Sequence, residues 1–376
     1  MIAFLSLAST MVSAAYGDGV GIYSLQADGD WPERRRRLLG GWRTDDLAQS
    51  CAPAVLARSM RGLDPPAPLR VLTDSAATAR DMRGLGLEPA MIDARLVRAV
   101  AARRRARPEL SAAKALTLYK IEVLAKVEHE WACFVDLDVV FRRGASLARF
   151  LSDPAARSAD LLACSAGAPL NAGLFCARPR RADYEQLLAL VANGSFSHAN
   201  GWEDAGPVSA SARARDPSYW DWYGRFVAAN AAMPADAVRG WRFTGADIEQ
   251  GLLYHHYGRR FARPFGCAYA FERGGHFAHE PAPLGGGGLL HHFLGNGKPW
   301  QNRLFASPAD ARAYDRHHEG RFCEWWALLA SWRRQAGGAS RNSTCWRAFE
   351  APGKFSVSTL STHARALCPA GRRGRM

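Results

Sequence analysis

The sequence predicts an α/β fold in which a mostly parallel central sheet is flanked by helices. Strand-like and helix-like segments alternate in the N-terminal half, as is typical of a parallel sheet with helices on its faces. Strand-like segments farther along are almost continuously apolar, as in strands buried on both faces. Hydrophobic residues make up 48% of the 376 residues, which supports a sizeable core and excludes a disordered chain or a coiled coil.

The alternation is clearest in the first hundred residues. The expected elements are, in chain order, a strand at 20–25, a helix at 54–60, a strand at 69–74, a helix at 76–85 and a strand at 89–92. Lys114–Val127 predicts an amphipathic helix, because its apolar residues recur mostly at helical spacing. Buried strands are expected at 131–141, 161–164 and 172–177, and a further helix at 322–332.

The sequence indicates that the chain consists of three regions. Residues 1–18 are either a signal-like segment or the first strand, because 2–15 are apolar and end in small residues but lack a positively charged start. Residues 19–300 are expected to form the main domain, with an aromatic-rich insertion at about 193–242. Residues 301–376 are expected to form a C-terminal helical extension that ends in a disordered tail.

The net charge of +14 does not identify a partner. Nearly all of the positive charge comes from arginine in a chain rich in alanine and glycine, which indicates compositional bias rather than a dedicated binding surface. The basic runs Arg34–Arg37 and Arg103–Arg105 are short and lack the interleaved aromatic residues of a single-strand binding groove. We therefore expect no nucleic-acid partner.

Eight cysteines and two glycosylation sequons bear on the cellular compartment. No C-x-x-C pair occurs, so a structural zinc site is not expected. Three cysteines in apolar runs are expected to act as small buried hydrophobic residues: Cys133, Cys164 and Cys176. Three cysteines near the C-terminus are candidates for disulfide pairing: Cys323, Cys345 and Cys368. The sequons at Asn193 and Asn342 favour, with these candidate disulfides, the secretory pathway or Golgi over the cytoplasm.

Asp136 and Asp138 are the most informative residues, because they stand inside the apolar run Trp131–Phe141. In a strand, residues two apart point to the same side, so the two carboxylates are expected to lie together. Buried like charges need compensation, and a divalent metal ion with oxygen ligands is the simplest one. The alternative is that the two residues end the strand at a solvent-exposed turn.

A second segment, His291–Trp300, offers groups that bind a metal ion or a phosphate. His292 offers an imidazole nitrogen, and Gly295–Gly297 offers backbone N–H groups that a ligand can approach closely. Lys298 adds a point charge suited to phosphate. Beside an Asp pair, these groups fit a metal–diphosphate site. The alternatives are a core histidine and an ordinary turn closed by Pro299.

Four blocks resemble, in the right order, the motifs of the family-8 glycosyltransferases, the glycogenin-like group. They are Lys120-Ile-Glu-Val-Leu leading into Phe134-Val-Asp136-Leu-Asp138, Asn171-Ala-Gly173-Leu-Phe, Asp247-Ile-Glu249-Gln250-Gly-Leu-Leu, and His292-Phe-Leu-Gly295-Asn-Gly-Lys298-Pro-Trp300. The last block is the most specific of the four. The resemblance covers residues 50–300, and the region after them is not covered.

The resemblance implies a single Rossmann-like nucleotide-diphospho-sugar transferase domain, the A-type glycosyltransferase fold. It implies a retaining enzyme that moves a hexosyl or pentosyl group from a UDP-sugar to a glycan, protein or small-molecule acceptor. The implied metal is Mn²⁺, with Mg²⁺ as the alternative, held by Asp136, Asp138 and His292. The resemblance also implies that Gly295, Gly297 and Lys298 hold the diphosphate and that Lys120 lies near the donor phosphates or the sugar. The residues implied to line the sugar and acceptor side are Asn171, Gly173, Glu249 and Gln250, and those implied in catalysis are Asp247, Glu249 and Gln250.

The sequence departs from the family pattern at several positions. Glu249 stands where the family usually has Asp, and Tyr254 stands where Asn is common. The aromatic residue that stacks on uracil is missing, since Leu47 and Gln49 occupy its neighbourhood. A catalytically degenerate nucleotide-sugar-binding relative is therefore the alternative. The insertion is longer than the family's usual connection, and it is either an acceptor platform or a surface subdomain that buries its own rings.

Overall fold

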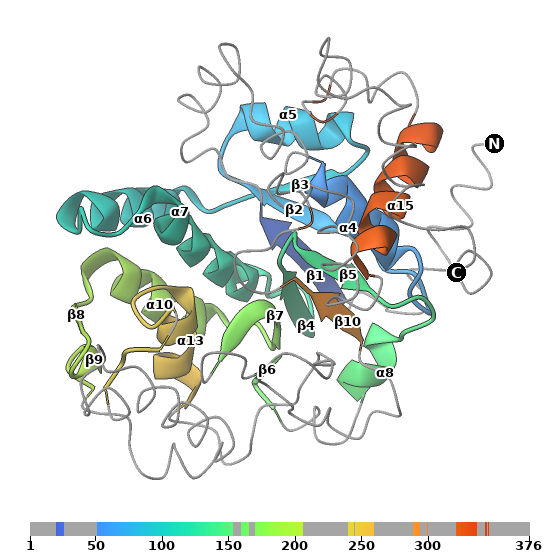
Figure 1. The fold of residues 1–376 in the computed structure, drawn as a ribbon. Helices are drawn as coiled ribbons and strands as arrows, with labels where there is room; N and C mark the ends of the chain where they lie inside the picture. Colours follow the sequence, from blue (N-terminus) through green and yellow to red (C-terminus); the bar gives the residue numbers. More distant parts are fainter. Residues whose placement is uncertain are drawn as a thin grey trace, which may run out of the picture.

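The computed structural model describes the parts of the chain that carry the expected sheet and most of the candidate site. The described residues are 20–25, 51–152, 159–164, 170–205, 240–243, 245–258, 289–293, 299, 321–336, 343 and 345. Within them, helices lie on both sides of a central sheet, which confirms the α/β prediction (Figure 1). The two alternatives for residues 2–15 and the expected disordered tail lie outside the described residues, and the domain boundaries stay predictions.

The central sheet has six strands in the order β3-β2-β1-β4-β7-β6. Their bounds are Val20–Leu25 (β1), Arg70–Thr73 (β2), Glu88–Met91 (β3), Trp131–Val135 (β4), Leu161–Cys164 (β6) and Asn171–Ala177 (β7). Neighbours from β3 to β4 pair in parallel, whereas β7 runs antiparallel to β4 and to β6. The sheet is therefore mixed but mostly parallel, and it is compatible with a Rossmann-like fold.

Two apolar cores cover the two faces of this sheet. One is contributed by α4 (Ala52–Met60), α5 (Ala76–Gly84), α8 (Leu147–Ser152) and α15 (Arg321–Gln335), and the other by α6 (Ala94–Ala106), α7 (Ala112–Thr117), the 3₁₀ helix η2 (Leu118–Ala125), α10 (Arg181–Asn193) and α13 (Glu249–Gly258). Along β4, Cys133 and Val135 belong to the first core, and Ala132 and Phe134 belong to the second. Because both faces of β4 are covered, every position along it is apolar.

The apolar run 131–141 is not the single strand that the sequence predicted. β4 ends at Val135, and β5 (Val139–Phe141) pairs antiparallel with β10 (Leu290–His292) in a separate two-stranded sheet. Asp136 and Asp138 lie in the connection between β4 and β5. The run divides where the carboxylates occur, because a strand buried on both faces offers no polar environment for a charge.

The helix predicted at 114–127 is also divided. α7 ends at Thr117, and η2 continues the segment as a 3₁₀ helix to Ala125. Every residue from Leu118 to Leu124 is buried, including the polar Lys120 and Glu122. The segment therefore passes through the interior instead of presenting one apolar face, and an amphipathic pattern is a poor guide to such a segment.

The aromatic insertion is described only at its two ends. Phe196–Ser197 (β8) and Gly201–Trp202 (β9) form a short antiparallel hairpin beside α13. Trp202 and Trp241 are both buried. These two rings are covered by protein, and the choice between a surface subdomain and an acceptor platform stays a prediction. Residues 206–239 lie outside the described residues.

The structure confirms that Cys323 and Cys345 are disulfide-bonded, and it corrects the expectation for Cys133 and Cys176. Cys133 and Cys176 are buried, but they are bonded to each other as partners in register on β4 and β7, a neighbourhood that the sequence does not reveal. Cys345 pairs with Cys51, at the start of α4, and Cys323 is also disulfide-bonded. Such bonds favour an oxidising compartment. No helix in the described ranges combines the length and apolar character that crossing a membrane demands.

Candidate metal centre

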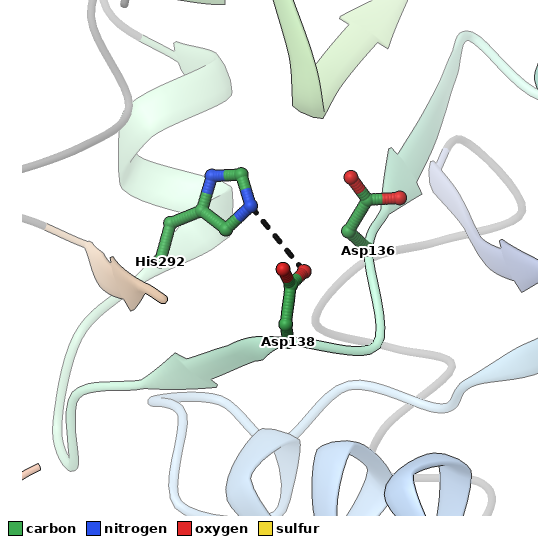
Figure 2. A group of neighbouring side chains, drawn as sticks. All are labelled: Asp136, Asp138 and His292. Carbon is green, nitrogen blue, oxygen red and sulfur yellow. Dashed lines mark ion pairs between the residues drawn. The ribbon is translucent and has the colours of Figure 1, made fainter. Parts of the chain in front are cut away.

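Asp136, Asp138 and His292 form a cluster that offers two carboxylates and one imidazole. One ligand atom from each residue lies within 4.8 Å of the other two. Nε2 of His292 is 3.3 Å from Oδ1 of Asp138. Figure 2 shows the two acids and the imidazole facing one another from the end of β4, the start of β5 and β10. The structure thus brings together the three residues that the resemblance assigned to the metal.

Hydrogen bonds between backbone groups determine where these three residues lie. The N–H of Asp136 donates to the carbonyl oxygen of Gly173 at 2.7 Å, which extends the pairing of β4 with β7 by one residue. His292 pairs with Val139 across the β5–β10 ladder, and the N–H of Phe293 donates to the carbonyl oxygen of Asp138 at 2.9 Å. The two acids are close because a turn joins their strands, and not because they alternate along one strand as predicted.

Gly173 allows the imidazole to approach β7. A Cβ atom at this position would lie 2.1 Å from Cε1 of His292, so only glycine fits without displacing the ring. The side-chain oxygen of Asn171 accepts a hydrogen bond from the Gly173 N–H at 2.8 Å. Asn171 and Gly173 therefore lie at the cluster, where Asn171 fixes the backbone against which His292 packs.

Lys120 is buried beside the cluster and neutralises part of its charge. Its Nζ lies 2.9 Å from Oδ1 and 3.1 Å from Oδ2 of Asp136, and 3.1 Å from Oε1 of Glu249. It also donates to the carbonyl oxygen of Ala172 at 3.2 Å. Burial by itself lowers the pKa of Lys120, but the charges of Asp136 and Glu249 outweigh burial and raise that pKa. The ammonium group therefore stays charged and bridges the two acids.

Glu249 and Gln250 reach the cluster from the first turn of α13. Both are buried, and Oε1 of Gln250 accepts a hydrogen bond from the Ala172 N–H at 3.1 Å. One oxygen of Glu249 pairs with Lys120, whereas its buried Oε2 has no hydrogen-bond partner in the described part of the chain. A buried carboxylate oxygen of this kind is an acceptor that a ligand hydroxyl or water can satisfy.

Not every expected site residue joins this group. Asp247 is half-buried, and its charge acts on Arg103 of α6; no ion pair joins it to Lys120 among the described residues. Gly295, Gly297 and Lys298 lie outside the described residues, so their place relative to the metal ligands stays a prediction. The sequence prediction did not include Ala172, whose backbone binds both Lys120 and Gln250, because a backbone contact leaves no side-chain motif.

The donor set fits a divalent metal ion. Two carboxylates and one imidazole are ligands that such ions accept. Burial and the neighbouring Asp138 raise the pKa of Asp136, while Lys120 and His292 oppose this rise. The side chains of Asp138 and His292 are 10% and 7% exposed, whereas that of Asp136 is 28% exposed, so the cluster is accessible on the Asp136 side. That arrangement suits a metal ion with coordination positions left for a ligand.

Comparisons with known proteins add no family assignment. No protein-family model matches the chain, and none of the curated proteins compared with it matches. What the site can do therefore rests on its own residues: a cluster able to hold a divalent cation, an adjoining buried lysine, and two polar side chains at the start of a helix.

Proposed function

We propose that this protein is a metal-dependent retaining glycosyltransferase that moves a sugar from a UDP-sugar to an acceptor. The single observation that carries the proposal is the convergence of Asp136 and Asp138 with His292, which is distant from them in sequence, with ligand atoms within 4.8 Å of one another. They meet where β4 ends, and the carboxyl ends of strands are where open α/β sheets bind their ligands. We propose Mn²⁺ as the metal, with Mg²⁺ as the alternative.

In this proposal, positive charges at the site bind the diphosphate of the donor and orient the donor. When bound, the cation would neutralise the negative charge that develops on the diphosphate as the anomeric C–O bond breaks. Lys298 and the N–H groups of Gly295 and Gly297 are proposed to hold the diphosphate, and Lys120 to hold Asp136 and Glu249 in place. No strong acid is needed, because the leaving group is stabilised by charge.

Retention of configuration requires either a nucleophilic carboxylate or a path in which the acceptor attacks on the leaving-group side. Glu249 is the better placed of the two candidate carboxylates, because it pairs with Lys120, whereas the charge of Asp247 acts on Arg103. Gln250 is proposed to position the sugar. The front-face path, which needs no protein nucleophile, remains the second mechanism.

One observation favours a degenerate nucleotide-sugar-binding protein as the second candidate function. Both carboxylate oxygens of Asp136 lie within 3.1 Å of Lys120 Nζ, so the lysine competes with a metal ion for this ligand. Such a protein would bind a UDP-sugar without turning it over. For either function we propose a secretory or Golgi location, because disulfides persist in oxidising compartments.

A panel of UDP-sugars tests the proposal by Mn²⁺-stimulated hydrolysis. We expect at least one donor to be hydrolysed by the full chain, and Asp138→Asn to abolish this activity without unfolding the protein. Asp204→Asn is the matched control, since Asp204 is exposed and Asn tolerates its positive φ of 48°. Hydrolysis that persists in Asp138→Asn rejects the metal centre; binding of UDP-sugars without any hydrolysis selects the degenerate relative.

A further inference from the structure

The hairpin β8–β9 is hydrogen-bonded to the loop that leads into α13, the helix that begins with Glu249 and Gln250. Trp202 is fully buried, and its indole Nε1–H donates to the carbonyl oxygen of Ala246 at 2.9 Å. Ala246 stands three residues before Glu249. A buried indole N–H is costly to leave unpaired, so this contact ties the loop to the hairpin.

The loop residues Gly245 and Ala246 pack closely against the first turn of α13, so the position of Ala246 affects the position of that turn. Gly245 has a φ of +76°, and a Cβ atom there would lie 2.3 Å from Nε2 of Gln250. The N–H of Gly251 donates to the carbonyl oxygen of Gly245 at 2.9 Å. A Cβ atom at Gly251 would lie 1.8 Å from the oxygen of Ala246, so that oxygen packs directly against the first turn of the helix. A displaced Ala246 therefore displaces Gln250 as well.

Arg103 lies over the ring of Trp202 and is a second contact that holds it. Its guanidinium carbon lies 4.3 Å from the centre of the Trp202 ring, and Nη1 donates to the carbonyl oxygen of Gly194 at 2.9 Å. Burial, with a smaller effect of Arg107, lowers the pKa of Arg103 to about 10, which leaves it charged at neutral pH. A stacked cation orients the ring, so Trp202 is held by Arg103 of α6, whose guanidinium is itself hydrogen-bonded at the end of α10.

We propose that Trp202 is a positioning residue for Glu249 and Gln250. Its indole N–H holds Ala246, and through it the first turn of α13, so that Gln250 reaches the Ala172 N–H and Glu249 reaches Lys120. The part of the aromatic insertion around Trp202 thus has a role in the site, in addition to burying its own rings. The catalytic consequence rests on the proposed function, whereas the structural consequence does not.

The first experiment removes only the N–H donor. In the full chain, Trp202 is replaced by 3-benzothienylalanine, in which sulfur takes the place of the indole N–H, and Trp202→Phe is the genetically encoded counterpart. Amide hydrogen exchange is measured residue by residue. We expect the Ala172 amide to exchange about tenfold faster or more, while amides of β1 and β2 keep their rates. An unchanged exchange rate at Ala172 in the sulfur isostere overturns the proposal.

The second experiment measures the catalytic consequence. In Mn²⁺-dependent UDP-sugar hydrolysis, we expect kcat of the isostere to fall roughly tenfold or more, because small displacements of positioned groups are costly. The KM for the UDP-sugar and the affinity for Mn²⁺ should change by less than about twofold, since the metal ligands are untouched. If Trp202 had only a structural role, its replacement would lower the melting temperature but would not lower kcat while leaving KM unchanged.

Trp241→Phe is the matched control. Trp241 is also buried and packs against Tyr254 of α13, but through its ring. We expect this variant to be less stable and to keep its kcat and its exchange rate at Ala172. An equal loss of kcat in Trp241→Phe would indicate a general packing effect and overturn the proposal. If the unmodified protein hydrolyses no UDP-sugar, the proposed function fails, while the exchange rate at Ala172 still decides the role of Trp202.

Discussion

At the scale of single residues, the metal centre depends on glycine at position 173, which has no side chain, as much as on the ligands themselves. His292 comes from β10 and Asp136 follows β4, and the two meet over Gly173 of β7. Any Cβ atom at Gly173 would overlap the imidazole ring. The position of His292 is therefore determined by close approach of a ring to a backbone, which is a role that only glycine performs.

Gly173→Ala is expected to push His292 away from the two acids. We predict a loss in Mn²⁺ affinity of roughly 10- to 100-fold, as is typical when a group that orients a metal ligand is lost. Isothermal titration calorimetry measures this affinity. Gly84→Ala is the control, because a Cβ atom there makes only ordinary contact, at 3.4 Å from Ser343. Equal Mn²⁺ affinity in the two variants would contradict the placement of His292.

Lys120 is the second residue with a distinct prediction. Lys120→Met leaves the buried Glu249 and the partly exposed Asp136 without their shared cation, which costs about 3 to 5 kcal/mol of unfolding free energy. A bound Mn²⁺ then becomes the principal counter-charge for Asp136, so we predict that Mn²⁺ raises the melting temperature more in Lys120→Met than in the unmodified protein. Calorimetry with and without Mn²⁺ checks this, with the exposed Lys114→Met as control. A smaller Mn²⁺-induced rise in Lys120→Met would count against the shared site.

At the scale of elements, the sequence predicts strands and helices well where one periodicity applies throughout. The strands at 20–25 and 161–164 and the helix at 322–332 occur where the pattern places them. The direction of β7 was not predictable, because a strand buried on both faces looks the same in sequence whether its neighbours are parallel or antiparallel. The break of 131–141 into β4 and β5 follows from partners that are distant in the chain, above all β10.

The helix α6 offers a prediction about stability and pH. Asp93 caps this helix, and its carboxylate accepts hydrogen bonds from the backbone N–H of Arg95 at 2.8 Å and from the Arg95 side chain at 2.7 Å. The hydrogen bond from the Arg95 side chain is the main cause that lowers the pKa of Asp93 from 3.8 to about 2. Because the folded pKa lies below the unfolded one, this stabilisation is complete above about pH 4 and is lost as the pH falls through 2.

Asp93→Ala is therefore expected to lower the unfolding free energy at pH 7 by about 1 to 2 kcal/mol. The difference from the unmodified protein should shrink as the pH falls toward 2, and urea unfolding at a series of pH values measures it. Asp93→Asn keeps the capping oxygen and loses the charge, so its deficit should be smaller. A deficit for Asp93→Ala that does not vary between pH 7 and pH 2 would contradict the charge-based part of the argument.

At the scale of the whole molecule, the described residues beyond 300 (α15, Ser343 and Cys345) belong to the fold. The Cys51–Cys345 disulfide spans 294 residues and joins this region to the start of α4, against which α15 also packs (Figure 1). The side chain of Trp326 on α15 donates a hydrogen bond to the carbonyl oxygen of Pro299, next to the expected phosphate-binding Lys298. Within the described residues, α15 and Cys345 are thus attached to the first core, and α15 is also attached to Pro299.

Removing this disulfide tests that attachment. We predict that the Cys51→Ala/Cys345→Ala double variant loses about 2 to 5 kcal/mol of unfolding free energy, because a cross-link between distant residues restricts the unfolded chain. Its Mn²⁺ affinity should be retained, since neither cysteine is one of the proposed metal ligands. Chemical unfolding and calorimetry measure the two quantities. A double variant as stable as the unmodified protein would show that the C-terminal region is held by packing alone.

The candidate site was predictable as a set of ligands and not as a geometry. Asp136, Asp138 and His292 were identified from residue types and order, and the structure brings them together. The positioning contacts were not predictable: Trp202 reaches Ala246 by a single indole N–H, and Gln250 reaches a backbone amide of β7. Such contacts depend on tertiary packing between distant elements, which no local pattern records.

The central claim is that one cation is held by Asp136, Asp138 and His292 and binds a diphosphate. Pulsed electron paramagnetic resonance of Mn²⁺ added to the full chain with UDP tests it most directly. We predict one ¹⁴N coupling from an imidazole, lost in His292→Gln, together with ³¹P couplings from the diphosphate on the same ion. Mn²⁺ that binds without a nitrogen coupling, or whose nitrogen coupling survives in His292→Gln, would contradict the claim.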